Sequence, residues 1–142
     1  MNGKTGIPSI GWNQSSRFAG PENSPGFNLW TDFLSWQRGL NRLLKPYGLT
    51  QPRFSLLAVV GWMSRGGSQP SQAEVARFTG MEPMQVSQGV RRLESDGFLM
   101  RVRSGSDKRG YSLSMTDEGL ETLARTLPEV EDYDEQYFGK PT

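Results

Sequence analysis

The fold is decided by residues 71–103, which read SQAEVARFTGMEPMQVSQGVRRLESDGFLMRVR. Ser71 and Glu74 have the Ser-x-x-Glu spacing of a capping box, in which the serine hydroxyl accepts a hydrogen bond from the amide of the glutamate and the glutamate side chain reaches back. A helix is therefore expected to begin at Ser71, and Gly80 is expected to end it after about two turns.

A second helix follows almost at once. Pro83 suits the first helical position, where a backbone N–H would have no helical partner, and the helix is expected to run to about Asp96. Gly97 suits the left-handed residue that follows many helices. From residue 98 the period changes to two, which is typical of a strand.

The flanking segments extend this order on both sides. Upstream, apolar residues at spacings of three and four predict helices over residues 28–44 and from Pro52 to about residue 64. Downstream, residues 111–115 alternate again, so a β-hairpin with a charged tip is expected. Thr116 then has the position of an N-cap for a last helix, which Pro128 is expected to kink or restart before a further short helix.

The predicted order is helix, helix, short helix, helix, hairpin, helix. This is the plan of a winged helix-turn-helix domain, mainly α with a small β-hairpin wing. In that plan the second helix of the turn enters the major groove of duplex DNA, and the wing lies alongside. A solvated face of an ordinary amphipathic helix is the alternative interpretation.

Charge favours the DNA interpretation. The net charge of +1 divides into +3 over residues 1–52, +4 over residues 53–112 and −6 over residues 113–142. The basic excess falls on the helix and wing that the plan turns toward DNA, where it would attract phosphates. Candidate DNA-binding residues on these two elements are Gln85, Ser87, Gln88, Arg91, Arg92, Arg101, Arg103, Lys108 and Arg109.

Composition excludes other chemistry. The 142 residues contain no cysteine and no histidine, which removes thiol chemistry, disulfides and the commonest general base and metal ligand. No stretch has the length and apolarity of a membrane span or a signal peptide. We therefore expect a cytoplasmic protein that is not an enzyme and that has no cofactor and no metal site.

Several motifs together resemble the multiple antibiotic resistance regulator (MarR) family. The resemblance covers about residues 29–138, and its most specific part is Asp107-x-Arg109 followed by Leu113-x-Met115-Thr116-x-x-Gly119. The other matching segments are residues 71–76, 79–80, 86–88, 92–94 and 97–99. Gly89 departs from the family pattern, which usually has an apolar residue there.

The resemblance implies roles for individual residues. Arg109 is the candidate for the minor groove, and Asp107 is the candidate that braces the wing. Thr50 and Ser71, near helix starts, are candidate phosphate contacts. The family's operators are pseudo-palindromic and its members pair through their terminal helices, so a homodimer is implied, although the last helix is expected to be shortened here.

The family often senses small aromatic or anionic compounds. Aromatic residues on the elements that would line such a pocket are Trp30, Phe33, Trp36, Phe54 and Trp62. Ordinary core packing is the alternative interpretation for each of them.

These observations predict four segments: a flexible arm over residues 1–27, an N-terminal dimerisation helix over 28–50, a winged helix-turn-helix lobe over 51–116, and C-terminal dimerisation helices over 117–142. The expected function is that of a sequence-specific regulator of transcription, a repressor that binds duplex DNA as a homodimer and is relieved by a small aromatic ligand. The alternative is a winged-helix interaction module that pairs with another regulator and no longer reads an operator alone.

Overall fold

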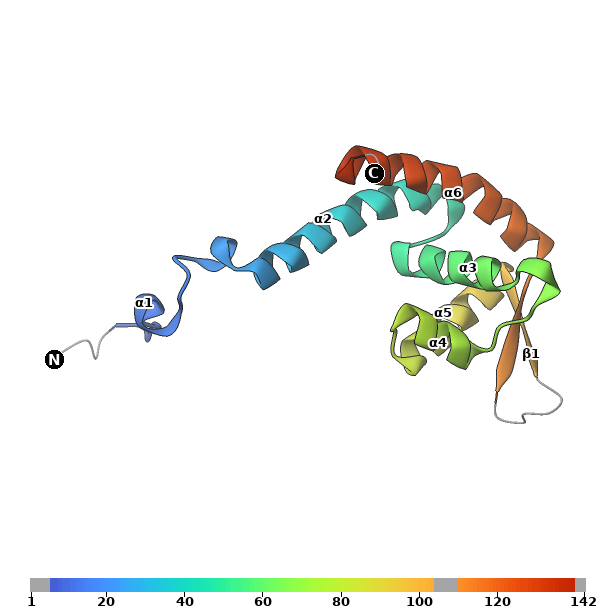
Figure 1. Cartoon of the computed structure of the whole chain (residues 1–142), viewed down its shortest axis with the longest axis horizontal. Coiled ribbons are helices and arrows are strands. Elements are labelled where there is room, and N and C mark those ends of the chain that lie inside the picture. Colours follow the sequence, from blue (N-terminus) through green and yellow to red (C-terminus); the bar gives the residue numbers. More distant parts are fainter. Residues whose placement is uncertain (1–5, 104–109, 140–142) are drawn as a thin grey trace. The chain divides into compact units, whose positions relative to one another are not determined.

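The computed structural model describes residues 6–103 and 110–139, which form two compact units divided between Gln37 and Arg38. The main chain elements, in order, are α1 (Trp12–Ser15), α2 (Pro25–Leu44), α3 (Gln51–Met63), α4 (Gln72–Thr79), α5 (Pro83–Ser95), β1 (Leu99–Arg103), β2 (Tyr111–Met115) and α6 (Asp117–Phe138) (Figure 1). The predicted class, mainly α with a β-hairpin wing, is confirmed.

The first unit contains short elements where the sequence predicted only a flexible arm. Besides α1 it has a single 3₁₀ turn over Pro21–Asn23. The indole N–H of Trp12 donates to the carbonyl of Phe18 at 2.8 Å, which closes the chain after α1. Helix α2 begins in this unit and ends in the second.

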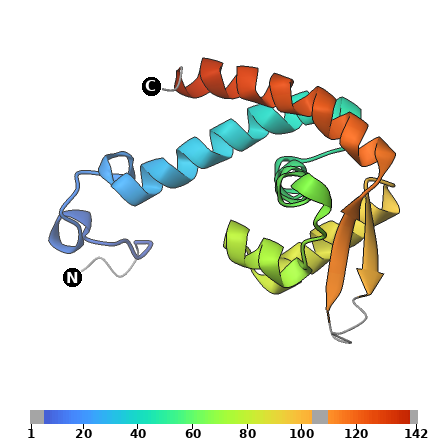
Figure 2. The same ribbon diagram turned by 45° about the vertical axis from the view of Figure 1, so that its right-hand side comes forward.

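The second unit is built on the helices α3, α4, α5 and α6, the end of α2 and the hairpin. Helix α3 packs on α4, α5 and α6, and α5 packs on β1. Figure 2 shows α3, α4 and α5 grouped beside the hairpin, with α6 leading away from the second strand. Side chains from every one of these elements are fully buried, among them Leu57, Val75, Val90, Leu99 and Leu113.

The hairpin is antiparallel and its register is fixed at both ends. Leu99 pairs with Met115 and Arg103 with Tyr111. The amide of Leu113 also donates to the carbonyl of Pro70 at 2.7 Å, so β2 is held against the residues that precede α4. The wing is thereby anchored to the start of the helix-turn-helix.

Helix α6 continues through Pro128, so the predicted restart into a further short helix is wrong. A proline inside a helix costs about 3 kcal/mol. However, the buried stripe of Leu123, Thr126 and Val130 continues past it at spacings of three and four. The hydroxyl of Thr126 also donates to the carbonyl of Thr122 at 2.9 Å. Packing on both sides of the proline thus keeps one helix.

A tyrosine before α3 is tied to α6. The hydroxyl of Tyr47 donates to the carboxylate of Glu129, and this hydrogen bond raises the pKa of the tyrosine above its ordinary value of 10.0.

Within the described residues, no helix combines the length and apolar character that crossing a membrane requires.

Candidate nucleic-acid interface

The turn between α4 and α5 is held by side-chain hydrogen bonds at both ends of α4. The capping box is confirmed: the Ser71 hydroxyl accepts from the Glu74 amide at 3.0 Å, and the Glu74 carboxylate accepts from the Ser71 amide at 3.1 Å. At the other end, Gly80 has left-handed backbone and the hydroxyl of Thr79 accepts from the amide of Met81 at 3.2 Å. The direction in which α5 leaves the turn is therefore fixed locally.

Helix α5 has one buried face and one exposed face. Val86, Val90 and Leu93 are fully buried. At 100° per residue, Met84, Gln88 and Arg91 fall on the opposite side, and all three are exposed. Among the other predicted contact residues, Gln85 and Arg92 are exposed and Ser87 is half-buried at the edges of this face. The structure thus brings the predicted residues of α5 onto one accessible surface.

Gly89 lies on the side of α5 that packs against Leu56 of α3. A Cβ atom at this position would overlap Cδ1 of Leu56, a buried residue of α3. A glycine inside a helix costs about 1 kcal/mol relative to alanine. Here the absence of a side chain leaves room for Leu56, which a larger residue would have to displace.

The predicted arginines differ in how they are held. The guanidinium of Arg92 pairs with Asp96 at 3.1 Å, one turn further along α5, and 58% of the Arg92 side chain is exposed. An exposed pair of this kind contributes only a few tenths of a kcal/mol. Arg92 is therefore accessible to an incoming phosphate.

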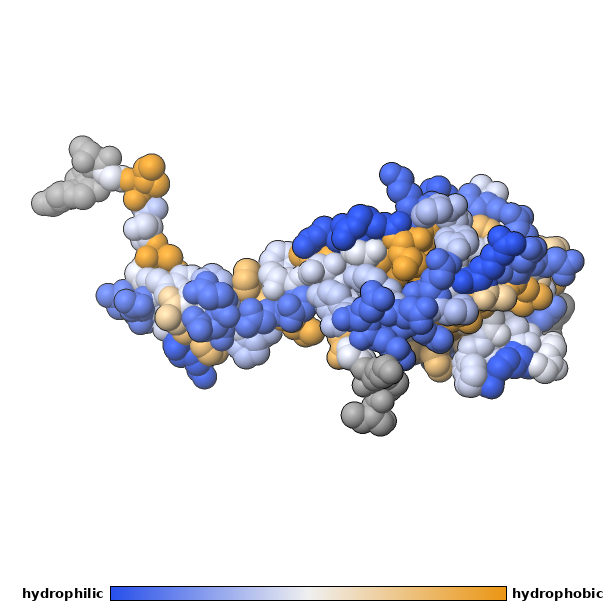
Figure 3. Space-filling model, turned by 90° about the horizontal axis from the view of Figure 1, so that it is seen from above, coloured by the Kyte–Doolittle hydropathy of each residue, from blue (hydrophilic) through white to orange (hydrophobic). Residues whose placement is uncertain are grey.

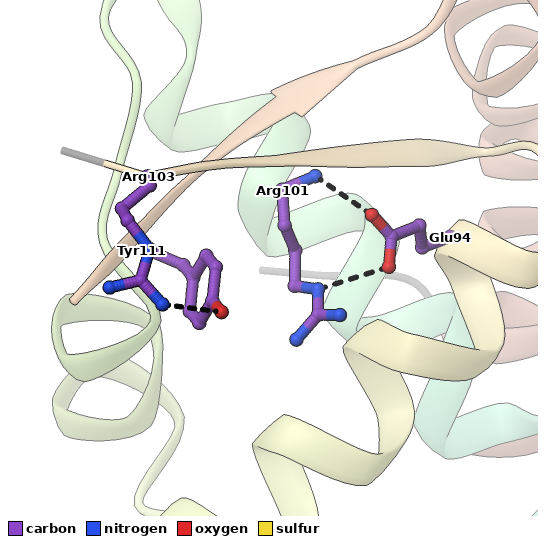
Figure 4. Close-up of polar contacts among 4 residues, drawn as sticks. All are labelled: Glu94, Arg101, Arg103 and Tyr111. Carbon is purple, nitrogen blue, oxygen red and sulfur yellow. Dashed lines mark hydrogen bonds and ion pairs between the residues drawn. The ribbon is translucent and has the colours of Figure 1, made fainter. Parts of the chain in front are cut away.

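On the wing, Arg101 is held by α5. Its Nε atom donates to Oε1 of Glu94 at 3.0 Å and its backbone amide donates to Oε2 at 3.3 Å (Figure 4). Only 22% of the Arg101 side chain is exposed. These bonds brace the wing against α5, and the DNA contact predicted for Arg101 stays a prediction.

Tyr111 of β2 lies between the two wing arginines. The guanidinium carbons of Arg101 and Arg103 lie 4.8 and 5.2 Å from the centre of its ring. Arg103 also donates from Nη2 to the tyrosine hydroxyl at 3.2 Å (Figure 4). Cations over a ring face are attracted by its quadrupole. Sequence reasoning missed Tyr111, because alternation alone does not show which residues of two strands are neighbours.

The candidates at the tip of the wing lie outside the described residues. These are Asp107, Lys108 and Arg109, and their roles stay predictions. Of the two candidate phosphate contacts, Thr50 precedes α3 without capping it through its side chain, and the Ser71 hydroxyl is engaged in the capping box.

The candidate ligand residues are divided between the two units. Phe54 is buried in the core of the second unit, and Trp62 is exposed with the guanidinium of Arg65 stacked on its ring. Trp30 and Phe33 are exposed in the first unit, where Trp36 is half-buried. A hollow of about 370 Å³ opens at the end of α3, but its lining includes none of the five predicted aromatics. The predicted pocket is therefore still only a prediction.

The fold and the exposed basic helix define a winged helix-turn-helix protein of the DNA-binding type. Residues 47–110 match the model of the MarR family. The HTH-type transcriptional regulator YdcH of Bacillus subtilis is 40% identical over 123 residues, which cover 87% of this chain and 84% of YdcH. The chain belongs to the MarR family of transcriptional regulators.

Solved structures of low identity share the fold. CouR from Rhodococcus jostii RHA1, bound to p-coumaroyl-CoA, is 24% identical with a TM-score of 0.73, covering 87% of this chain and 85% of CouR. MepR from S. aureus, in complex with DNA, is 14% identical with a TM-score of 0.73, covering 85% of each chain.

Proposed function

We propose that this regulator is a repressor that binds a pseudo-palindromic DNA operator as a homodimer. The observation that carries the proposal is the exposed face of α5, where amide and guanidinium groups lie opposite the buried valines. Gln85 and Gln88, near the start of the helix, have the chemistry to read adenine edges in the major groove. Arg91 and Arg92, further along, suit phosphate or guanine.

The wing supplies the second contact of the proposal. Arg103 on β1, together with Lys108 and Arg109, would meet the phosphates and the minor groove beside the helix. Asp107 would brace the tip through charged hydrogen bonds. Arg101, which also stays a candidate DNA contact, would in addition orient β1 against α5 through Glu94.

Exposed apolar surface supports the homodimer. In the first unit, Leu29, Trp30 and Phe33 are 73, 59 and 44% exposed, and Figure 3 shows hydrophobic residues on the surface of this unit. In the second unit Phe138, at the end of α6, is 68% exposed. A second copy would cover this surface through the segments 28–50 and 117–142. Two copies would also present two recognition helices to two half-sites.

A small aromatic ligand is the proposed signal that relieves repression in the cytoplasm. Exposed aromatic side chains support this part, since they offer stacking surface. CouR, which has the same fold, is bound to p-coumaroyl-CoA in its crystal structure.

The test is DNA selection from random duplexes, followed by fluorescence anisotropy over a salt series and light scattering on the free protein. We expect a dimer that binds a two-fold symmetric sequence, with an affinity that falls linearly on logarithmic axes as salt rises. No salt-sensitive binding to any duplex at low ionic strength would refute the proposal. A strict monomer at micromolar concentration would instead favour the interaction module that pairs with another regulator.

A further inference from the structure

Met84 is an exposed apolar side chain at the start of the proposed recognition helix. It lies in the first turn of α5 and is 72% exposed. Gln88 lies one helical turn further along the same face, and Arg91 follows it. A single exposed hydrophobic residue is common on protein surfaces and has no meaning by itself. Its position among the polar groups of this particular face is what calls for an explanation.

The neighbours of Met84 indicate which base pair this part of the helix suits. Gln85 and Gln88 are exposed amides, and an amide can bond to the N6 and N7 atoms of adenine at the same time. The thymine paired with that adenine displays its C5-methyl group in the same groove. An unbranched, flexible thioether side chain fills irregular apolar gaps well. One amide and one apolar side chain together therefore match both halves of an A·T pair or of two adjacent ones.

We infer that Met84 is a specificity-determining residue that packs on the C5-methyl group of a thymine in each operator half-site. The inference rests on the proposed DNA-binding function and adds to it that the half-site contains thymine opposite the start of α5. Met84 contributes no charge, so its effect is on sequence preference rather than on salt dependence.

The experiment replaces thymine by deoxyuridine, one position at a time and symmetrically, in the operator that the wild-type protein selects. Deoxyuridine keeps every hydrogen-bonding group of thymine and lacks only the methyl group. Affinity is measured by anisotropy at one fixed salt concentration for the wild-type chain, Met84→Ala and Met84→Leu. Met100→Ala is the matched control, since Met100 is also exposed, at 55%, but lies on β1.

At one thymine of the half-site, we expect wild-type affinity to fall about fourfold for each methyl group removed. Met84→Ala should bind the thymine and deoxyuridine duplexes equally, whereas Met84→Leu and Met100→Ala should keep the preference. The inference is overturned if the wild-type chain binds its operator but shows no preference at any thymine, or if Met84→Ala keeps the preference. Failure to bind every duplex would overturn the proposed function as well, so the two failures are distinguishable.

Discussion

The carboxylate of Glu94 binds both the side chain and the backbone amide of Arg101, at 3.0 and 3.3 Å. The two residues belong to α5 and β1, so this contact fixes the wing relative to α5. Both side chains are partly shielded from solvent, with 22% of Arg101 and 37% of Glu94 exposed. A charge-assisted bond in such a place is worth more than one at the open surface.

Replacing Arg101 by glutamine should therefore act on the orientation of the wing and not on phosphate binding. We expect Arg101→Gln and Glu94→Gln each to lower the free energy of unfolding by about 1 kcal/mol in urea denaturation. Both variants should weaken DNA binding while the slope of log affinity against log salt stays at the wild-type value. A slope that falls by about 1 in Arg101→Gln alone would identify a direct phosphate contact instead.

A double variant that combines Arg101→Gln with Glu94→Gln measures the energetic coupling between the two side chains. The effects of the two substitutions on stability should be non-additive, with a coupling energy of about 1 kcal/mol. The exposed pair Arg92–Asp96 on the same helix is the matched control, and its coupling should be about 0.3–0.5 kcal/mol. Equal coupling in the two pairs would contradict the bracing role.

In contrast to Arg101, Arg91 should affect DNA binding and not stability, because it is exposed at the centre of the α5 face. We expect Arg91→Gln to leave the free energy of unfolding within about 0.5 kcal/mol of the wild type. It should weaken DNA binding and reduce the salt slope by about 1 if Arg91 contacts one phosphate. Anisotropy at several salt concentrations measures both. Arg125→Gln, which removes an exposed arginine from the acidic α6, is the control and should change neither value.

Local signals in the sequence predicted most of the fold. The capping box at Ser71, the glycine after α4 and the proline at the start of α5 act within a few residues, and the structure contains them as predicted. The restart expected at Pro128 does not occur, because the buried stripe of α6 continues on both sides of the proline. Whether the helix continues through that proline depends on tertiary packing, which the residues around the proline do not reveal.

The sequence indicated which helix and which strand carry the candidate site, but not which side chains touch one another. Alternation along β1 identified a strand, yet it did not show that Arg101 lies toward Glu94 seven residues earlier. Likewise a methionine near a helix start is usually read as core, and only its exposed position placed Met84 beside the glutamines. Both facts depend on how α5 is oriented against the elements packed on it, which the pattern along the chain does not contain.

Gly119 is expected to tolerate no side chain. The hydroxyl of Thr116 accepts from the amide of Gly119 at 2.9 Å and donates to the carbonyl of Gly97 at 2.6 Å, which draws the start of α6 against the start of the wing. A Cβ atom at 119 would overlap the carbonyl oxygen of Phe98, and backbone cannot move aside cheaply. Gly119→Ala should lower the free energy of unfolding by about 3 kcal/mol.

Urea denaturation followed by circular dichroism measures this change. Gly26→Ala is the control, because a Cβ atom there would meet no atom within 4 Å and alanine favours the helix. A Gly119→Ala variant as stable as the wild type would show that the Thr116-x-x-Gly119 motif does not depend on close packing.

The exposed aromatic residues of α2 lead to a prediction about the formation of the homodimer. If a second copy covers Trp30, as proposed, then Trp30→Glu places a charge in an apolar interface and should shift the chain from dimer to monomer. Sedimentation velocity at micromolar concentration measures the shift. Phe78→Glu is the matched control, since Phe78 is equally exposed, at 62% against 59% for Trp30, but lies on α4 beside the turn. The control should stay dimeric. A Trp30→Glu variant that is dimeric and binds the operator with wild-type affinity would remove α2 from the interface.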